Sequence, residues 1–276
     1  MWKTSLLAPT LILGLTLAIP VSAQAPDGSA PVAAIPVPVL LAGEALALAD
    51  MEGGIHTYGE AQKESPMGSL AKLVWLRLEG DDWGARDVIF KCKGEMGPYH
   101  CWLRKGHGKV DLAKATQESC NLAFLAWAIQ SAERWKKDLG EGAGRARLED
   151  VFQPFLGDRL PPGDKLPELT PAWIGDGDLL RTSPEALIRW LVDPAQDELL
   201  SRCRRLLLSF VDETFKTDVW WMKTGTGPVL SDPSLTSAWV VGSNGLVVAV
   251  LHLPAGRGKV EGIARFKAVM GIHGKK

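Results

Sequence analysis

Residues 65–80 read SPMGSLAKLVWLRLEG, a stretch that joins a hydroxyl and an amine to the start of an apolar helix. Ser69 precedes Lys72 by three residues, so on a helix the two side chains share a face and can meet. The residues that follow are apolar nearly all round, which indicates a buried central helix. Burial lowers the pKa of a lysine, and such a lysine can take the proton of a serine. The stretch therefore predicts either a serine nucleophile with its own base or an ordinary helix start with a solvated lysine.

Two further short motifs bear on that choice. Residues 119–121 read SCN, an S-x-N motif in a helical stretch, and residues 223–226 read KTGT on a β-rich run that ends in glycines. Taken singly, each fits an ordinary helix or strand end, and a chain of this length contains roughly one S-x-x-K by chance. Here S-x-x-K, S-x-N and K-T-G occur once each and in that order, which is the signature of penicillin-binding proteins and serine β-lactamases.

On these motifs the chain resembles the penicillin-recognising serine acyltransferases, and within them the transpeptidase domain of class B penicillin-binding proteins. Three longer stretches, at residues 92–124, 173–190 and 238–253, are also similar to segments of those domains, and the resemblance covers roughly residues 41–270. It implies an α/β fold in which a five-stranded antiparallel sheet is flanked by helical layers. Asn121 fits many penicillin-binding proteins but not class D β-lactamases, which have an apolar residue there.

The resemblance also implies roles for individual residues. Ser69 would attack the carbonyl of a D-Ala-D-Ala bond, and Lys72 would take its proton. Ser119 would relay a proton to the leaving amine, and Asn121 would hold Lys72 and the substrate amide. The K-T-G strand would bind the substrate and its terminal carboxylate through Lys223, Thr224, Gly225 and Thr226. Backbone N–H groups of Ser69 and Thr226 would form the oxyanion hole.

The activity that the resemblance implies is that of an exported D,D-transpeptidase or D,D-carboxypeptidase. Its substrates would be peptidoglycan stem peptides, β-lactam antibiotics would acylate it, and cell-wall synthesis proteins are possible partners. No cofactor and no metal are expected. Two alternatives remain open: a β-lactamase of class D-like type, and a non-catalytic module that binds or senses peptidoglycan. The formal net charge of −1 gives no reason to expect a nucleic-acid partner.

The start of the chain has the features of an export signal. A short positively charged start, an apolar run and a small-x-small cleavage signal predict a signal peptide over residues 1–23. The Pro- and Ala-rich residues 24–40 predict a flexible leader, and residues 41–276 predict the penicillin-binding transpeptidase-like domain. The expected location is periplasmic or secreted.

Export permits disulfides. Cys92 and Cys101 bracket a short Gly- and Pro-containing loop and are predicted to pair, whereas Cys120 and Cys203 lie in apolar helical stretches and fit buried thiols. Without a CxxC pair or an HExxH sequence, the chain offers little support for a zinc site. His107 is expected to be a turn or packing histidine.

The remaining pattern predicts the elements and the core. Tryptophans 75, 102 and 127 are expected in the core rather than at a substrate platform. Strands are predicted over 44–50 and 55–60, a loop over 81–110, a helix over 111–137, and no regular structure from there to about 182. Helices are predicted over 183–193, 197–215 and 259–271, and a meander of three strands over 218–227, 236–244 and 245–253. The two ends of the chain would then complete one sheet.

Overall fold

The computed structural model describes residues 38–50, 53–208 and 220–272. The expected signal peptide and nearly all of the expected leader lie outside the described residues. Within the described ranges, no helix is both long enough and apolar enough to cross a membrane.

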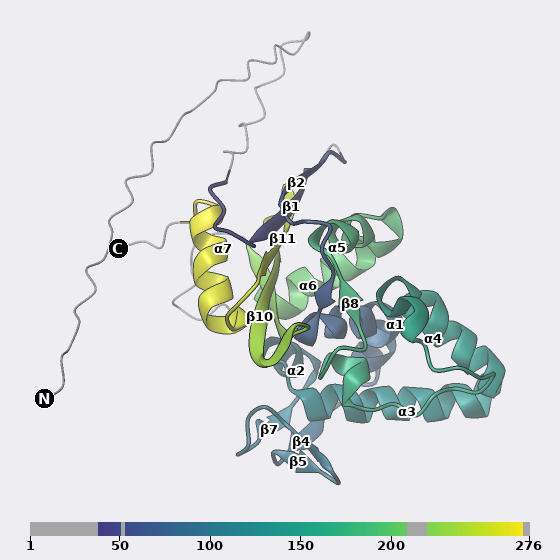
Figure 1. Cartoon of the computed structure of the whole chain (residues 1–276). Helices are drawn as coiled ribbons and strands as arrows, with labels where there is room; N and C mark the ends of the chain where they lie inside the picture. The colour runs from purple at the N-terminus through teal and green to yellow at the C-terminus, as the bar shows by residue number, and fades with distance from the viewer. Residues whose placement is uncertain (1–37, 51–52, 209–219, 273–276) are drawn as a thin grey trace, which may run out of the picture. The chain divides into compact units, whose positions relative to one another are not determined.

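The two ends of the described chain build one antiparallel sheet, as the sequence predicts (Figure 1). Its strands are β1 (Ala45–Asp50), β2 (Ile55–Gly59), β9 (Trp221–Val229), β10 (Asp232–Ser243) and β11 (Val247–Leu253). Their order is β2-β1-β11-β10-β9, so the first strand pairs with the last, with Ala47 opposite Val250. The K-T-G sequence therefore lies on β9, at one edge of the sheet.

Helices cover both faces of this sheet. Figure 1 shows α7 (Ile263–Val269) on one side and α5 (Pro184–Leu191) and α6 (Asp197–Leu208) on the other. Ser183 begins α5 as predicted, because its hydroxyl accepts the N–H of Ala186 at 3.1 Å, the usual N-cap bond. The remaining helices, with short 3-10 turns between them, are α1 (Ala71–Ala85), α2 (Leu112–Gln117), α3 (Asn121–Leu139) and α4 (Glu141–Leu156).

The central helix α1 contributes buried aromatic side chains to the core between the helices. Trp75 is fully buried and stacks between Trp83 and Trp135, with ring centroids 6.1 and 6.2 Å away. Its indole N–H donates to the carbonyl of Trp173 at 2.8 Å, so its polar atom is satisfied in the core. Trp127 is also buried, which confirms two of the three predicted core tryptophans.

Three stretches differ from the expected elements. The loop expected over 81–110 instead includes the end of α1 and four short strands. These are β4 (Phe90–Cys92), β5 (Glu95–Met96), β6 (Tyr99–His100) and β7 (Gly108–Val110). Residues 141–156 form α4 where no regular structure was predicted, because burial of Leu148, Phe152 and Phe155 outweighs the helix-weakening glycines and Pro154. The helix expected over 111–137 is broken into α2 and α3 at residues 118–120. This break contains Ser119 and has a functional consequence.

Candidate active site

The Ser69 turn begins the site. Ser69 lies in a 3-10 turn, Gly68–Leu70, that leads directly into α1. The ammonium of Lys72 donates to Ser69 Oγ at 3.0 Å, so the three-residue spacing does bring the two side chains together. Lys72 is fully buried whereas Ser69 is half-buried. A weak nucleophile is thus partly exposed to solvent while its neighbouring amine is enclosed by protein.

Close backbone contact joins this turn to the K-T-G strand. Gly68 has a φ of +53°, and a Cβ added there would lie 2.3 Å from the carbonyl oxygen of Thr226. A Cβ on Gly225 would lie 2.4 Å from the carbonyl oxygen of Met67. Only glycine permits approach this close. The two glycines therefore allow the backbones of the nucleophile turn and of β9 to pack directly against each other.

The S-x-N sequence enters the site from the break between α2 and α3. Asn121 is the first residue of α3, and its Oδ1 accepts a hydrogen bond from Lys72 Nζ at 2.9 Å. Ser119 adopts a left-handed conformation with φ of +50°, and its Oγ accepts from Lys223 Nζ at 2.5 Å. Each lysine of the site therefore contacts one residue of the S-x-N sequence.

The two lysines form the electrostatic centre of the site. Lys72 is fully buried and Lys223 is 2% exposed. The hydrogen-bond partners of Lys72 are Ser69 Oγ, Asn121 Oδ1 and the carbonyl of Ile174, all of them neutral oxygens. Burial lowers the pKa of Lys72 to about 8. Burial and the nearby charge of Lys72 hold the pKa of Lys223 well below its usual range. Among the residues that the structure describes, neither lysine has a carboxylate partner, and buried cationic groups of this kind favour an anionic ligand.

The remaining predicted residues complete β9 beside this centre. The Thr224 carbonyl accepts a second hydrogen bond from Lys223 Nζ at 2.8 Å. The Thr226 hydroxyl accepts the N–H of Gly258 at 2.9 Å, and Thr226 is exposed. The structure thus brings together the eight residues that the sequence nominated, drawn from the α1 start, the α2–α3 break and β9: Ser69, Lys72, Ser119, Asn121, Lys223, Thr224, Gly225 and Thr226.

The cysteines are arranged differently from the prediction. Cys92 and Cys101 are free thiols rather than a disulfide. Both sulfurs face Nδ1 of His107, at 3.6 and 3.4 Å, and Cys120 completes a buried group whose sulfur and nitrogen atoms all lie within 4.8 Å of one another. His107 is buried against these thiols, which fits a packing histidine, and the four side chains are of the kinds that bind metal ions, although no metal was predicted. Cys203, on α6, is buried as predicted.

The spacing of this group explains why sequence reasoning missed it. The four residues follow the pattern C-x8-C-x5-H-x12-C, which lacks the tight C-x2–4-C pair of common zinc sites. The available signal was the number of glycines in the loop between Cys92 and His107, because tight turns bring distant ligands together.

Trp102 is also placed differently from the prediction. It is 52% exposed, and its indole N–H donates to the carbonyls of Glu118 and Ser119 at 3.0 and 3.2 Å. The ammonium of Lys259 lies 6.0 Å from its ring centroid. Trp102 therefore lies beside Ser119 at the protein surface and not in the core.

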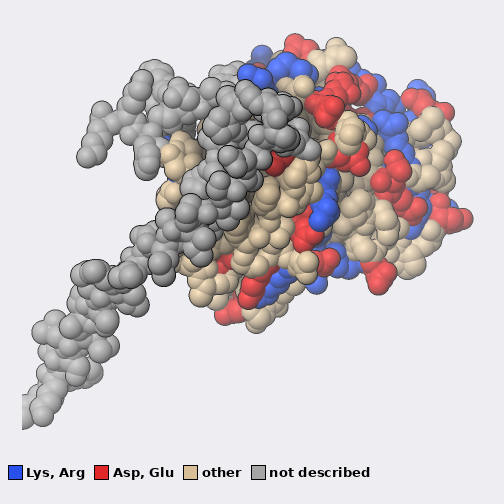
Figure 2. All heavy atoms as spheres, turned by 90° about the horizontal axis from the view of Figure 1, so that it is seen from above, with Lys and Arg blue, Asp and Glu red and all other residues tan. Residues whose placement is uncertain are grey.

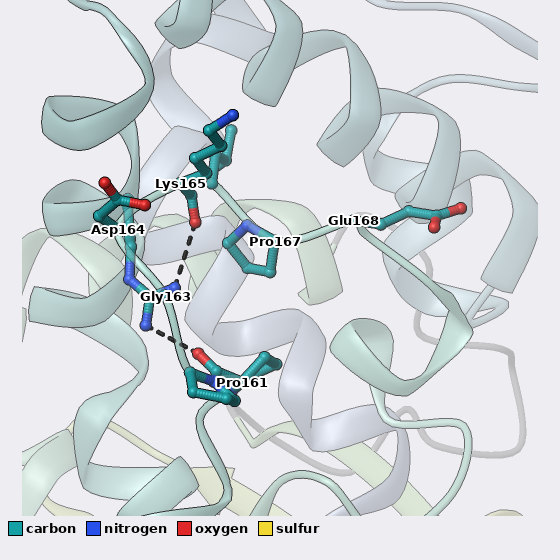
Figure 3. Close-up of a pocket in the computed structure, with 9 residues that line it drawn as sticks. Pro161, Gly163, Asp164, Lys165, Pro167 and Glu168 are labelled. Carbon is teal, nitrogen blue, oxygen red and sulfur yellow. Dashed lines mark hydrogen bonds between the residues drawn. The ribbon is translucent and has the colours of Figure 1, made fainter.

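A pocket elsewhere in the molecule lacks the serine–lysine pair of the candidate active site. It lies between α4 and residues 161–168, and Figure 3 shows the carboxylates of Asp164 and Glu168 directed away from it. The guanidinium of Arg145 extends into it and donates to the carbonyls of Pro161 and Lys165 at 2.8 and 3.1 Å. The cation is thus already satisfied by the loop that forms the pocket.

Comparisons with known proteins rest on structure. No protein-family profile matches the sequence, and no curated protein matches it. Among solved structures, PBP2 of Pseudomonas aeruginosa, solved in complex with WCK 5153, aligns with a TM-score of 0.56 at 16% identity over 84% of this chain and 75% of that one. The class D β-lactamase of Bacillus subtilis aligns with a TM-score of 0.54 at 18% identity over 83% of this chain and 92% of that one.

A third structure gives the same result. The class D β-lactamase BAT-2 aligns with a TM-score of 0.53 at 16% identity, covering 84% of this chain and 92% of that one. These similarities agree with the mixed α/β architecture, the five-stranded antiparallel sheet and its covering helices. The chain therefore has the penicillin-recognising serine acyltransferase fold, the fold of penicillin-binding protein transpeptidase domains and class D β-lactamases.

Proposed function

We propose that this protein is an exported serine D,D-transpeptidase or D,D-carboxypeptidase that acts on D-Ala-D-Ala stem peptides of peptidoglycan and is acylated by β-lactams. One observation carries the proposal: Lys72 Nζ lies 3.0 Å from Ser69 Oγ and 2.9 Å from Asn121 Oδ1. A buried amine with a lowered pKa, in contact with an accessible hydroxyl, is the arrangement that activates a serine. The fold supports the same reaction class.

The reaction follows from these contacts. Ser69 Oγ attacks the substrate carbonyl while its proton passes to Lys72, and the carbonyl oxygen becomes negative in the tetrahedral intermediate. Ser119 then passes its hydroxyl proton to the nitrogen of the departing D-alanine and takes a proton from Lys223, which donates to it. The C–N bond breaks and an ester forms on Ser69. Water or the amine of a second stem peptide attacks that ester and loses a proton through Ser119 to Lys223, while Lys72 returns its proton to Ser69.

The β9 strand supports the proposed substrate. It lies at the edge of the sheet, and an edge strand can pair with an extended peptide. Lys223 on this strand presents an ammonium where the terminal carboxylate of a stem peptide would bind. The face drawn in Figure 2 mixes acidic and basic side chains without a large region of one sign. A small peptide carboxylate fits this pattern better than a polyanion.

Cell-wall synthesis proteins are the partners we propose. A solved structure described as a peptidoglycan synthase complex that coordinates polymerization and crosslinking includes a chain of this fold. It aligns with a TM-score of 0.56 at 16% identity over 84% of this chain and 56% of that one. The location proposed with this function remains periplasmic or secreted.

Intact-protein mass spectrometry after incubation with benzylpenicillin tests the proposal. Opening of the β-lactam ring by Ser69 adds the whole mass of one penicillin, because no group leaves. Ser69→Ala is expected to remain unlabelled, and Ser65→Ala, which removes a half-buried serine four residues upstream, is expected to label like the wild type. Labelling of Ser69→Ala would remove Ser69 from its role. An unlabelled wild type would favour the non-catalytic module.

A β-lactamase is the second candidate, since class D enzymes share the fold. In those enzymes a carboxylated lysine in an apolar pocket activates the hydrolytic water. Here the amide of Asn121 and the carbonyl of Ile174 contact Lys72 and make the pocket polar. We therefore expect a penicilloyl adduct that persists for minutes or longer and does not decay faster with bicarbonate. Rapid nitrocefin turnover, accelerated by bicarbonate, would establish the β-lactamase instead.

A further inference from the structure

Three thiols and one imidazole converge next to the S-x-N sequence, and the proposed acyl transfer does not use them. Cys92, Cys101 and Cys120 are no more than 2% exposed, and His107 is 7% exposed. Their sulfur and nitrogen atoms all lie within 4.8 Å of one another. His107 Nδ1 contacts two of the sulfurs, and the thiols of Cys101 and Cys120 contact each other, so four ligand-type atoms face one point.

The distances fit a tetrahedral metal centre. Zinc binds thiolate sulfur at about 2.3 Å and imidazole nitrogen at about 2.0–2.1 Å, which at a tetrahedral angle separates the two ligand atoms by about 3.6 Å. His107 Nδ1 lies 3.6 Å from Cys92 Sγ and 3.4 Å from Cys101 Sγ. A disulfide between Cys92 and Cys101 would leave Cys120 and the imidazole without a role. Thiolate and imidazole ligands together select Zn²⁺ over Mg²⁺ or Ca²⁺.

The second nitrogen of His107 supports the same assignment. Nε2 is buried and has no hydrogen-bond partner among the described residues, and Glu118 Oε2 lies 4.0 Å away. When Nδ1 binds a metal, Nε2 carries the proton, and metal-bound histidines usually donate that proton to a carboxylate or carbonyl. A small movement of the Glu118 side chain, which is 39% exposed, would complete this bond.

The loop backbone is built to hold the ligands close. Gly94 and Gly106 have φ values of +93° and +78°. A Cβ on Gly106 would lie 2.3 Å from the Cys92 carbonyl oxygen, and the Cys101 N–H donates to the Gly94 carbonyl at 2.8 Å. Left-handed glycines and such a bond form the tight turns that place two distant cysteines beside one histidine.

Two covalent neighbours tie this group to Ser119. Cys120 directly follows Ser119, whose φ of +50° is unusual for a residue with a side chain. Trp102 directly follows Cys101 and donates its indole N–H to the Ser119 carbonyl at 3.2 Å. A bond at Cys120 Sγ and a bond at Cys101 Sγ would therefore restrain the Ser119 backbone from both sides.

We propose that Cys92, Cys101, His107 and Cys120 bind one Zn²⁺ through three thiolates and one imidazole nitrogen, and that this centre holds Ser119 beside Lys223. Binding releases the thiol protons to solvent and needs no oxidant. The positioning of Ser119 for acylation rests on the proposed function, whereas metal binding and the order of the loop do not. Cys120 is thus a positioning residue, since it acts through Ser119.

Metal analysis of the full chain purified without chelators tests binding. The wild type should hold about one zinc per chain, and cobalt substitution should give the thiolate-to-metal charge-transfer band of a tetrahedral sulfur site. Cys203→Ala, which removes the buried cysteine outside the group, should bind the same amount. A wild type without metal, whose melting temperature is also unchanged by added Zn²⁺, would overturn the proposal.

Two variants of Cys120, one to aspartate and one to asparagine, test whether the metal centre positions Ser119. Aspartate and asparagine are similar in size, and both suit the N-cap position that Cys120 occupies at α3. Only aspartate binds zinc well. Cys120→Asp should retain zinc and penicillin acylation within about tenfold of the wild type, whereas Cys120→Asn should lose zinc and slow acylation by about tenfold to a hundredfold. Equal behaviour of the two variants would overturn the positioning role.

Hydrogen exchange separates this proposal from the proposed function. Chelation of the wild type should raise amide exchange in peptides that cover residues 115–121 and leave β9 unchanged. This readout does not require a reaction with penicillin. If zinc binds and chelation loosens the loop but nothing acylates Ser69, the proposed function fails and the metal centre stands. Unchanged exchange on metal removal would overturn the positioning role even if acylation is normal.

Discussion

Two buried charges lie on the same helix, α1, and the protein treats them differently. Glu79 is 2% exposed and Lys72 is fully buried. Glu79 accepts hydrogen bonds from four donors, on Ser131, Arg134, Trp135 and Arg147, at 2.7, 2.5, 3.1 and 3.2 Å. Within the described part of the chain, Lys72 donates hydrogen bonds to neutral oxygens, two of which belong to Ser69 and Asn121. A charge that is fully paired supports the fold, whereas a charge left without a counter-ion is available to a ligand or a proton.

The comparison predicts opposite costs for removing the two charges. Replacing a paired buried charge leaves its partners unpaired, which destabilises the protein. Replacing an unpaired buried ammonium with an apolar side chain of similar length removes a desolvation cost. Stability and activity should therefore respond in opposite ways at these two positions on α1.

The largest effect is expected from Lys72→Met. Loss of the base should slow acylation by benzylpenicillin by at least about a thousandfold near neutral pH, because general base catalysis is worth about 10²–10⁴ and the serine also loses its partner. The free energy of unfolding should stay the same or rise by about 1–3 kcal/mol. Stopped-flow acylation and urea unfolding measure the two. Lys63→Met, at an exposed lysine, is the control. A Lys72→Met protein that acylates normally would remove the assigned base.

Glu79→Ala should have the opposite profile. Arg134 and Arg147 would lose their buried counter-ion, so the free energy of unfolding should fall by about 3–5 kcal/mol. The folded fraction should still acylate at a rate close to that of the wild type, because Glu79 does not contact the site. Glu133→Ala, at an exposed acidic residue on α3, should change stability by less than about 0.5 kcal/mol. A loss of acylation larger than the loss of folded protein would contradict the division between the two charges.

Asn121→Val sharpens the comparison by removing one of the neutral oxygens that contact Lys72. Acylation should slow by about tenfold to a hundredfold, because both the hydrogen bond to the base and the proposed contact with the substrate amide are lost. The pocket also becomes less polar, so slow hydrolysis of the adduct, stimulated by bicarbonate, becomes possible. Adduct lifetime followed by mass spectrometry measures this. An adduct as long-lived as that of the wild type, with bicarbonate present, would show that Asn121 does not control lysine carboxylation.

The sequence was sufficient to predict the contact between Ser69 and Lys72, but not the conformation around Ser119 or the contacts of Cys120. Ser69 and Lys72 lie on a regular turn and helix, so their spacing alone predicted their contact. Ser119 lies at a helix break with a positive φ, and the sequence around it reads as a continuous helix. Local patterns did not show that Cys120 packs against Cys92, Cys101 and His107, because these contacts join residues that are distant in sequence.

The same distinction holds for the fold. The strand at residues 45–50 and the C-terminal meander alternate or are continuously apolar, so their pairing into one sheet could be predicted from pattern and topology. The helix α4 could not, since its glycines and Pro154 weaken the local signal and its stability comes from the burial of Leu148 and Phe152. Tertiary packing decides such segments.

The pH dependence of acylation gives the smallest effect and tests the cause of the difference between the two charges. Burial lowers the pKa of Lys72 from 10.5 to about 8, and only the neutral amine can take the serine proton. The acylation rate should therefore rise about tenfold per pH unit below pH 7 and level off above about pH 8–9. The unfolded lysine binds its proton up to about pH 10.4, so between about pH 8 and 10.4 the unfolded state binds more protons than the folded state. Stability should rise with pH across this window, and the Lys72 contribution to that rise should vanish in Lys72→Met.

An acylation rate that is flat from pH 6 to 9 would mean that Lys72 is already neutral at pH 6, or that another group takes the proton. Lys72→Met separates the two cases: a variant that no longer acylates identifies a base with a still lower pKa, and one that acylates identifies a different base.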